Sequence, residues 1–102
     1  MDLKDTYKYL VGAYYGIQEM DNYSLKEYVL QDIQEYINNF IKENPISNYD
    51  YEKEKELINK ELSLKTKLQD SLLVLPKVNA STELILLVKK RLKEIKEEEK
   101  NK

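Results

Sequence analysis

Both glycines of this 102-residue chain lie in one stretch, residues 9–18, which has no charged side chain although 35% of the chain is charged. The stretch also holds three of the nine tyrosines. Glycine and proline occur only twice each, which is too few for a fold with many tight turns and favours long helices over an all-β fold. A glycine inside a helix costs about 1 kcal/mol relative to alanine. Gly12 and Gly16 therefore predict that another backbone approaches this helix closely.

Residues 3–20 are predicted to form the first helix, with Asp2 as its N-cap. Hydrophobic residues recur there at steps of four and three and form one apolar stripe: Leu3, Tyr7, Leu10, Tyr14 and Ile17. Apolar and small residues form a second set behind this stripe: Tyr9, Gly12, Ala13, Gly16 and Met20. A helix that is apolar on most of its circumference is usually buried on more than one side. The second set is therefore expected to pack against a fourth helix or against a second copy of the chain in a homodimer.

Two further helices follow in the pattern. Ser24 and Glu27 have the spacing of a capping box, which predicts a second helix over residues 25–42. A third helix of about two dozen residues begins near residue 51, with Asp50 among its capping candidates, and ends before Pro76. Its hydrophobic stripe drifts around the helix, so the pattern also allows a kink or a break near Ser63.

The last third of the chain is open to two interpretations. Residues 72–75 and 84–88 are continuous apolar runs, and such short runs fit either helices or buried strands. Abundant leucine and the absence of a turn glycine favour a fourth helix capped by Asn79 or Ser81. The sequence therefore predicts an all-α, four-helix bundle-like domain over residues 1–96, followed by a charged tail at 97–102. The alternative is three helices followed by a C-terminal β-hairpin, similar in outline to a winged helix-turn-helix.

The amino-acid composition excludes several kinds of metal-binding and catalytic site. The chain has no cysteine and no histidine, so it lacks thiolate ligands, imidazole ligands and the commonest general base. The carboxylates are spread over polar helix faces, and no phosphate-binding glycine loop is present. We therefore expect no enzyme activity, no metal and no cofactor. The sequence also has no signal-peptide pattern and no apolar run of about 18 residues, which predicts a cytoplasmic protein without a membrane partner.

Charge divides the chain into two unlike halves. Residues 1–50 hold nine acidic and four basic residues, whereas residues 51–102 hold ten acidic and thirteen basic residues. The polar face of the second helix is acidic and carries an aromatic residue, which is typical of a protein-binding surface, and its candidate residues are Tyr28, Gln31, Asp32 and Glu35. The basic residues near the C-terminus suggest DNA binding as the alternative, with Lys77, Lys89, Lys90, Arg91 and Lys93 as candidates.

In size, acidity and tyrosine content the chain resembles small inhibitors encoded by phages or plasmids, anti-CRISPR proteins among them. It is also similar to bacteriocin immunity proteins, which are helical bundles of about this length. Neither family is matched residue by residue, so no functional residues are transferred from them. The resemblance implies an inhibitory or accessory protein of a mobile genetic element whose acidic surface occupies a basic groove on its partner.

Overall fold

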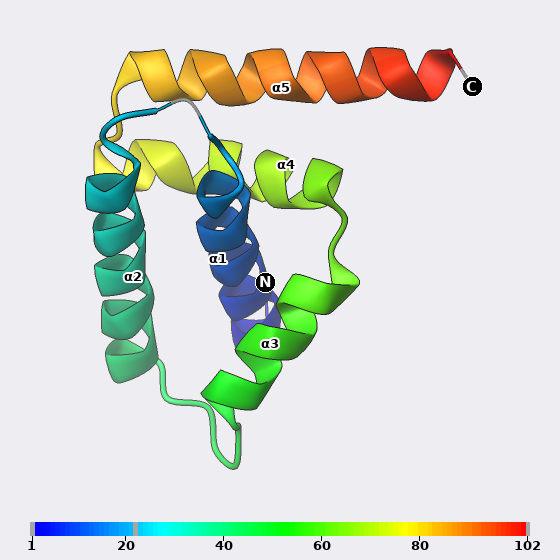
Figure 1. Cartoon of the computed structure of the whole chain (residues 1–102). Coiled ribbons are helices and arrows are strands. Elements are labelled where there is room, and N and C mark those ends of the chain that lie inside the picture. Colours follow the sequence, from blue (N-terminus) through cyan, green and yellow to red (C-terminus); the bar gives the residue numbers. More distant parts are fainter. Residues whose placement is uncertain (1, 22, 102) are drawn as a thin grey trace.

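A computed structural model describes residues 2–21 and 23–101 and shows an all-α domain (Figure 1). The described residues contain no strand, so the all-α prediction is confirmed and the alternative with a C-terminal β-hairpin is wrong. Five α-helices and one short 3₁₀ turn follow each other along the chain: α1 (Leu3–Gln18), α2 (Lys26–Glu43), α3 (Tyr51–Glu61), α4 (Leu64–Val74), η1 (Leu75–Val78) and α5 (Thr82–Lys100).

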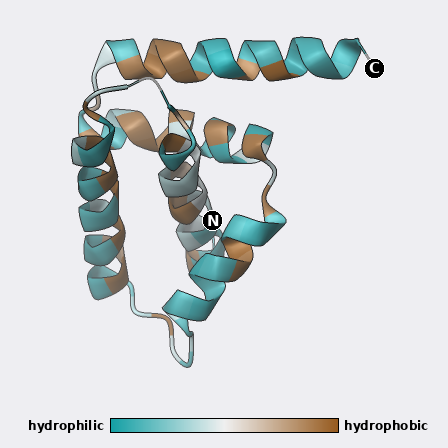
Figure 2. Ribbon diagram, in the orientation of Figure 1, coloured by the Kyte–Doolittle hydropathy of each residue, from teal (hydrophilic) through white to brown (hydrophobic). Residues whose placement is uncertain are grey.

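Helix α1 is the centre of the fold. It packs against α2, α3 and, most extensively, α4, whereas α5 lies across one end of the molecule and packs chiefly against α4 (Figure 1). Helix α2 turns its hydrophobic band towards α1 and its hydrophilic side outwards (Figure 2). The largest fully buried side chains come from four different helices and include Tyr7, Leu10, Ile33, Leu68 and Leu84. The apolar stretch around residues 9–18 is therefore the core of the domain.

Short polar side chains cap most of the helices. Asp2 accepts a hydrogen bond from the Lys4 amide at 2.8 Å, and Asp50 accepts one from the Lys53 amide at 3.2 Å. Ser81 caps α5 by accepting from the amide of Leu84. All three residues were capping candidates in the sequence, because Asp and Ser satisfy the free amide groups of a first helical turn.

The predicted capping box at Ser24 and Glu27 is wrong. Helix α2 begins at Lys26, its N-cap is Leu25, and no side chain caps it. The physical reason is a backbone turn just before the helix, in which the Lys26 amide donates to the Tyr23 carbonyl oxygen at 3.2 Å. Tyr23 itself is buried, and its hydroxyl lies 2.7 Å from Ser81 Oγ. This long-range contact fixes the chain path, and a local sequence signal cannot reveal it.

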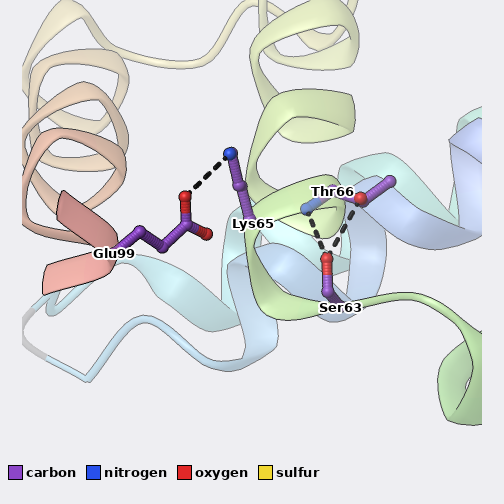
Figure 3. Close-up of polar contacts among 4 residues, drawn as sticks. All are labelled: Ser63, Lys65, Thr66 and Glu99. Carbon is purple, nitrogen blue, oxygen red and sulfur yellow. Dashed lines mark hydrogen bonds and ion pairs between the residues drawn. The ribbon is translucent and has the colours of Figure 1, made fainter. Parts of the chain in front are cut away.

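The predicted single third helix is divided into α3 and α4, so residues 2–21 and 23–101 contain five α-helices instead of the four predicted. The backbone of Leu62 is extended, and Ser63 Oγ accepts a hydrogen bond from the Thr66 amide at 3.2 Å (Figure 3). The break near Ser63, which the sequence allowed, is therefore a full helix end followed by a new N-cap. It lets α3 and α4 contact different parts of α1.

Residues 72–88 form the end of α4, the turn η1 and the start of α5. Pro76 lies at the start of η1, where its missing amide proton costs nothing. Asn79 closes the turn with a φ of 56°, a left-handed conformation that asparagine tolerates better than most residues. Helix α5 then continues to Lys100, so it includes most of the segment 97–102 that the sequence assigned to a tail.

Candidate binding surfaces

The second set of residues on α1 faces α4. A Cβ atom added at Gly16 would lie 2.5 Å from Ser71 Oγ and 2.6 Å from the carbonyl oxygen of Lys67, so only glycine fits there. Ser71 Oγ lies 3.2 Å from the Ala13 carbonyl oxygen and 2.9 Å from that of Lys67, and it can donate to either. The two helices therefore meet through small residues and backbone atoms.

This packing determines how deeply each residue of the second set on α1 is buried. Gly12, Ala13 and Gly16 are buried inside the chain, while Tyr9 and Met20 are half-buried against the core. The buried three cannot touch a second copy in this conformation. They pack against α4, which is the second half of the predicted third helix. They do not pack against the predicted fourth helix or a second copy.

Two charged side chains of α4 border the contact with α1. Asp70 lies directly over Gly12, and burial raises the pKa of its carboxyl from 3.8 to about 6, although the positive charge of Lys8 opposes the shift. Lys67 is buried, and its Nζ lies 3.7 Å from the carboxylate of Glu19. Neither side chain lines the hollows described below.

Two adjoining hollows lie along the exposed side of α2. The first, of about 450 Å³, is lined by residues of α2 and of the η1 turn: Asp32, Glu35, Tyr36, Asn39, Lys77, Val78 and Asn79. The second, of about 380 Å³, is lined by residues near the end of α2: Tyr36, Asn39, Phe40, Glu43 and Asn44. They share Tyr36 and Asn39 and therefore adjoin each other, and we refer to the two hollows together as a groove. We call this groove, together with Tyr28, the α2 edge.

The α2 edge brings together three of the four predicted protein-binding residues. Asp32 and Glu35 line the groove, and the helical spacing places Tyr28 on the same side, with 67% of its surface exposed. Gln31 is exposed but lines neither hollow. The opposite side of α2 faces α3, where Lys55 donates to Gln34 at 3.1 Å. A partner therefore has access to the Asp32 side of the helix.

Sequence reasoning missed part of this groove. Tyr36 and Phe40 were not among the candidate residues, yet both are half-buried and contribute aromatic surface to the hollows. Asn39 and Glu43 follow Asp32 by seven and eleven residues, a spacing that places all three on the same side of a helix. This spacing could have identified Asn39 and Glu43 from the sequence. Lys77, which the sequence grouped with the DNA-binding candidates, lines the hollow that contains Asp32 and Glu35.

The other DNA-binding candidates are divided between two sides of α5. Arg91 Nη1 lies 3.4 Å from Glu94 and 3.9 Å from Glu98, so its charge is largely compensated. Lys90 and Arg91 border a groove of about 320 Å³ that also includes Met20 and Leu68. Lys89 and Lys93 lie on another side of the helix, since residues four apart share a face. The five candidates therefore do not form one surface.

Among the described residues, no three Asp or Glu side chains lie close enough together to hold a metal ion. None of the described helices is long and apolar enough to cross a membrane. Comparison with protein-family models, with curated proteins and with solved structures found no match to this chain.

Proposed function

We propose that this chain is a non-enzymatic protein-binding module that uses the α2 edge to hold a partner segment with basic and apolar side chains. The observation that carries the proposal is the pair of adjoining hollows, one lined by Asp32, Glu35 and Tyr36 and the next by Tyr36 and Phe40. A groove of this kind offers charge complementarity and apolar contact to the same peptide segment.

Three side chains of the α2 edge, Tyr28, Asp32 and Glu35, make few contacts within the fold. Tyr28 is 67% exposed, and Asp32 and Glu35 are exposed and form no ion pair within the part of the chain that the structure describes. Tyrosine is enriched at protein interfaces because it buries a large rigid surface while its hydroxyl still finds a partner. Binding would therefore gain contact area at Tyr28 without breaking internal contacts.

We further propose that the protein is an inhibitory or accessory factor of the type encoded by phages and plasmids, acting in the cytoplasm. An acidic surface competes well for the basic grooves that other proteins use to bind nucleic acids, since both occupants present negative charge. The aromatic floor of the groove adds apolar contact that a phosphate backbone lacks. This combination supports a role as a competitor of nucleic acid at its partner.

Selection from a random peptide display library on the immobilised protein tests the proposal. We expect enrichment of peptides that combine Lys or Arg with aromatic or aliphatic residues. The double variant Asp32→Lys/Glu35→Lys should weaken the enriched peptides at least about tenfold, because it reverses the charge that they meet. Tyr28→Ala should weaken them by a similar factor through lost contact area. Fluorescence anisotropy of labelled peptides measures both effects.

The matched control carries the same change of charge elsewhere. Glu56→Lys/Glu61→Lys alters two exposed residues of α3 and should leave peptide affinity within about twofold, as expected for distant surface charges. Circular dichroism should be the same for all variants, since the changed residues are exposed. If the library enriches no peptide, or if the enriched peptides bind the Asp32→Lys/Glu35→Lys variant as tightly as the unaltered protein, the proposal is wrong.

A further inference from the structure

Helix α5 carries four lysines in a line. Lys89, Lys93, Lys96 and Lys100 follow each other at steps of four, three and four residues, so on a regular helix they fall within an arc of about 60°. We call this line the lysine edge. The line is about 16 Å long at the helical rise of 1.5 Å per residue. All four side chains are exposed, and none forms an ion pair with another described residue.

The neighbouring acids of α5 are mostly engaged elsewhere. Glu94 and Glu98 lie on the far side of the helix against Arg91. Glu99 reaches across to α4, where its carboxylate lies 3.1 Å from Lys65 Nζ (Figure 3). Glu97 is exposed on the outer side of α5, four residues after Lys93, without an ion pair in the described chain. The lysine edge therefore keeps most of its positive charge, although the chain as a whole has a net charge of −2.

We propose that the lysine edge binds the phosphate backbone of duplex nucleic acid without reading its sequence. Duplex DNA carries one negative charge per about 1.7 Å of its axis with both strands counted, so a 16 Å length of duplex holds about nine phosphates, of which four lysines on one side can contact a part. Lysine contacts phosphate as a point charge, whereas base recognition uses mainly arginine, asparagine and glutamine. The edge contains none of these three residues. The site is separate from the α2 edge and does not depend on the function proposed above.

The composition of the outer side of α5 favours nucleic acid over a lipid surface. A helix that lies on a membrane needs apolar side chains beside its basic ones to enter the interface. Leu86, which is 58% exposed, stands three residues before the lysine edge begins. The exposed side chains of α5 from Lys89 to Lys100 are all charged: Lys89, Lys90, Lys93, Glu94, Lys96, Glu97, Glu98, Glu99 and Lys100. Such a surface matches phosphates but offers nothing to the acyl chains.

Fluorescence anisotropy with a labelled 20-base-pair DNA duplex, repeated over a salt series, tests this proposal. We expect micromolar binding at low salt, with a slope of log K against log salt of about −3.5 because four phosphates are contacted. The variant with all four lysines of the edge changed to glutamine should bind at least about tenfold more weakly. Glutamine keeps a good helix propensity, so the circular dichroism spectrum should not change.

A matched control removes four exposed lysines outside α5, with the changes Lys4→Gln, Lys42→Gln, Lys53→Gln and Lys60→Gln. This control has the same net charge as the lysine-edge variant and should lose no more than about threefold in affinity, because only long-range attraction is altered. The proposal is overturned by no binding at about 100 µM protein and low salt, or by equal losses in the two variants. Lysine-dependent binding to vesicles of anionic phospholipid, without duplex binding, would overturn it in favour of a lipid surface.

Discussion

Helix α4 contacts both α1 and α5, and different kinds of atoms make the two contacts. Towards α1 it presents Ser71 and the backbone of Lys67, which lie so close to Gly16 that no side chain fits between the helices. On the side of α5, Leu64 and Leu68 line the same hollow as Leu87, and at the start of α4 the two helices are joined by the exposed ion pair of Lys65 and Glu99 (Figure 3). A contact made by backbone atoms cannot adjust to added volume, whereas a contact made by flexible side chains can. The comparison therefore predicts which changes the fold tolerates.

Gly16→Ala should have the largest effect. Its new methyl group would meet the Lys67 carbonyl group, which belongs to a helix and cannot move alone, so we expect a loss of about 1 to 3 kcal/mol in the free energy of unfolding. Gly12→Ala is the matched control, because its methyl group would meet the end of the Asp70 side chain, which can rotate away. There the gain in helix propensity, about 1 kcal/mol, offsets much of the cost. Urea denaturation followed by circular dichroism measures both, and equal losses would contradict this account of the α1–α4 contact.

Asp70→Asn should raise the free energy of unfolding, by a smaller amount than Gly16→Ala lowers it. The carboxyl pKa is about 6 in the folded protein and 3.8 as the reference value, so between these pH values the folded state binds more protons than the unfolded state. Stability therefore falls as pH rises from about 4 to 6 and stays lower above that range. Asparagine removes this penalty and should raise the free energy of unfolding by about 1 to 2 kcal/mol at pH 7.

The pH series provides the internal control for this prediction. Urea denaturation at pH 4 and pH 7 should give nearly equal stabilities for Asp70→Asn and the unaltered protein at pH 4, where the carboxyl is protonated in the folded state. A difference that is the same at both pH values would show that the substitution acts through packing and not through the charge of Asp70.

The ion pair between α4 and α5 should matter least. The side chains of Lys65 and Glu99 are 35% and 53% exposed, so water screens their attraction. A double-mutant cycle with Lys65→Ala and Glu99→Ala should give a coupling free energy below about 0.5 kcal/mol. A coupling above about 1 kcal/mol would mean that the α4–α5 contact is as specific as the α1–α4 contact.

Local signals predicted much of the fold. The apolar stripe at steps of three and four residues predicted α1, and the caps Asp2 and Ser81 marked helix starts within a few residues. The capping box at Ser24 was misleading because the burial of Tyr23 against Ser81, 58 residues away, sets the chain path there. Sequence periodicity describes one helix at a time and contains no information about such distant contacts.

The candidate surfaces were predicted less completely. The acidic side of α2 was visible as a polar helix face, but the half-exposure of Tyr36 and the arrival of Lys77 from η1 depend on how the helices pack. On α5, grouping Lys89, Lys90 and Arg91 by their adjacency in the sequence was the error, because consecutive residues of a helix point about 100° apart. The spacing of three and four residues that defines the lysine edge was present in the sequence.

The order of the helices along the chain also has a consequence for synthesis. The hydrogen bond from Ser71 to Ala13 joins residues 58 positions apart, so the small-residue side of α1 has no partner until α4 has been made. At roughly 5 to 20 residues per second, the apolar first helix waits about 3 to 12 seconds on the ribosome before it can be covered. During that interval the small-residue side of α1 stays uncovered, and the rate of translation through residues 20–70 determines for how long.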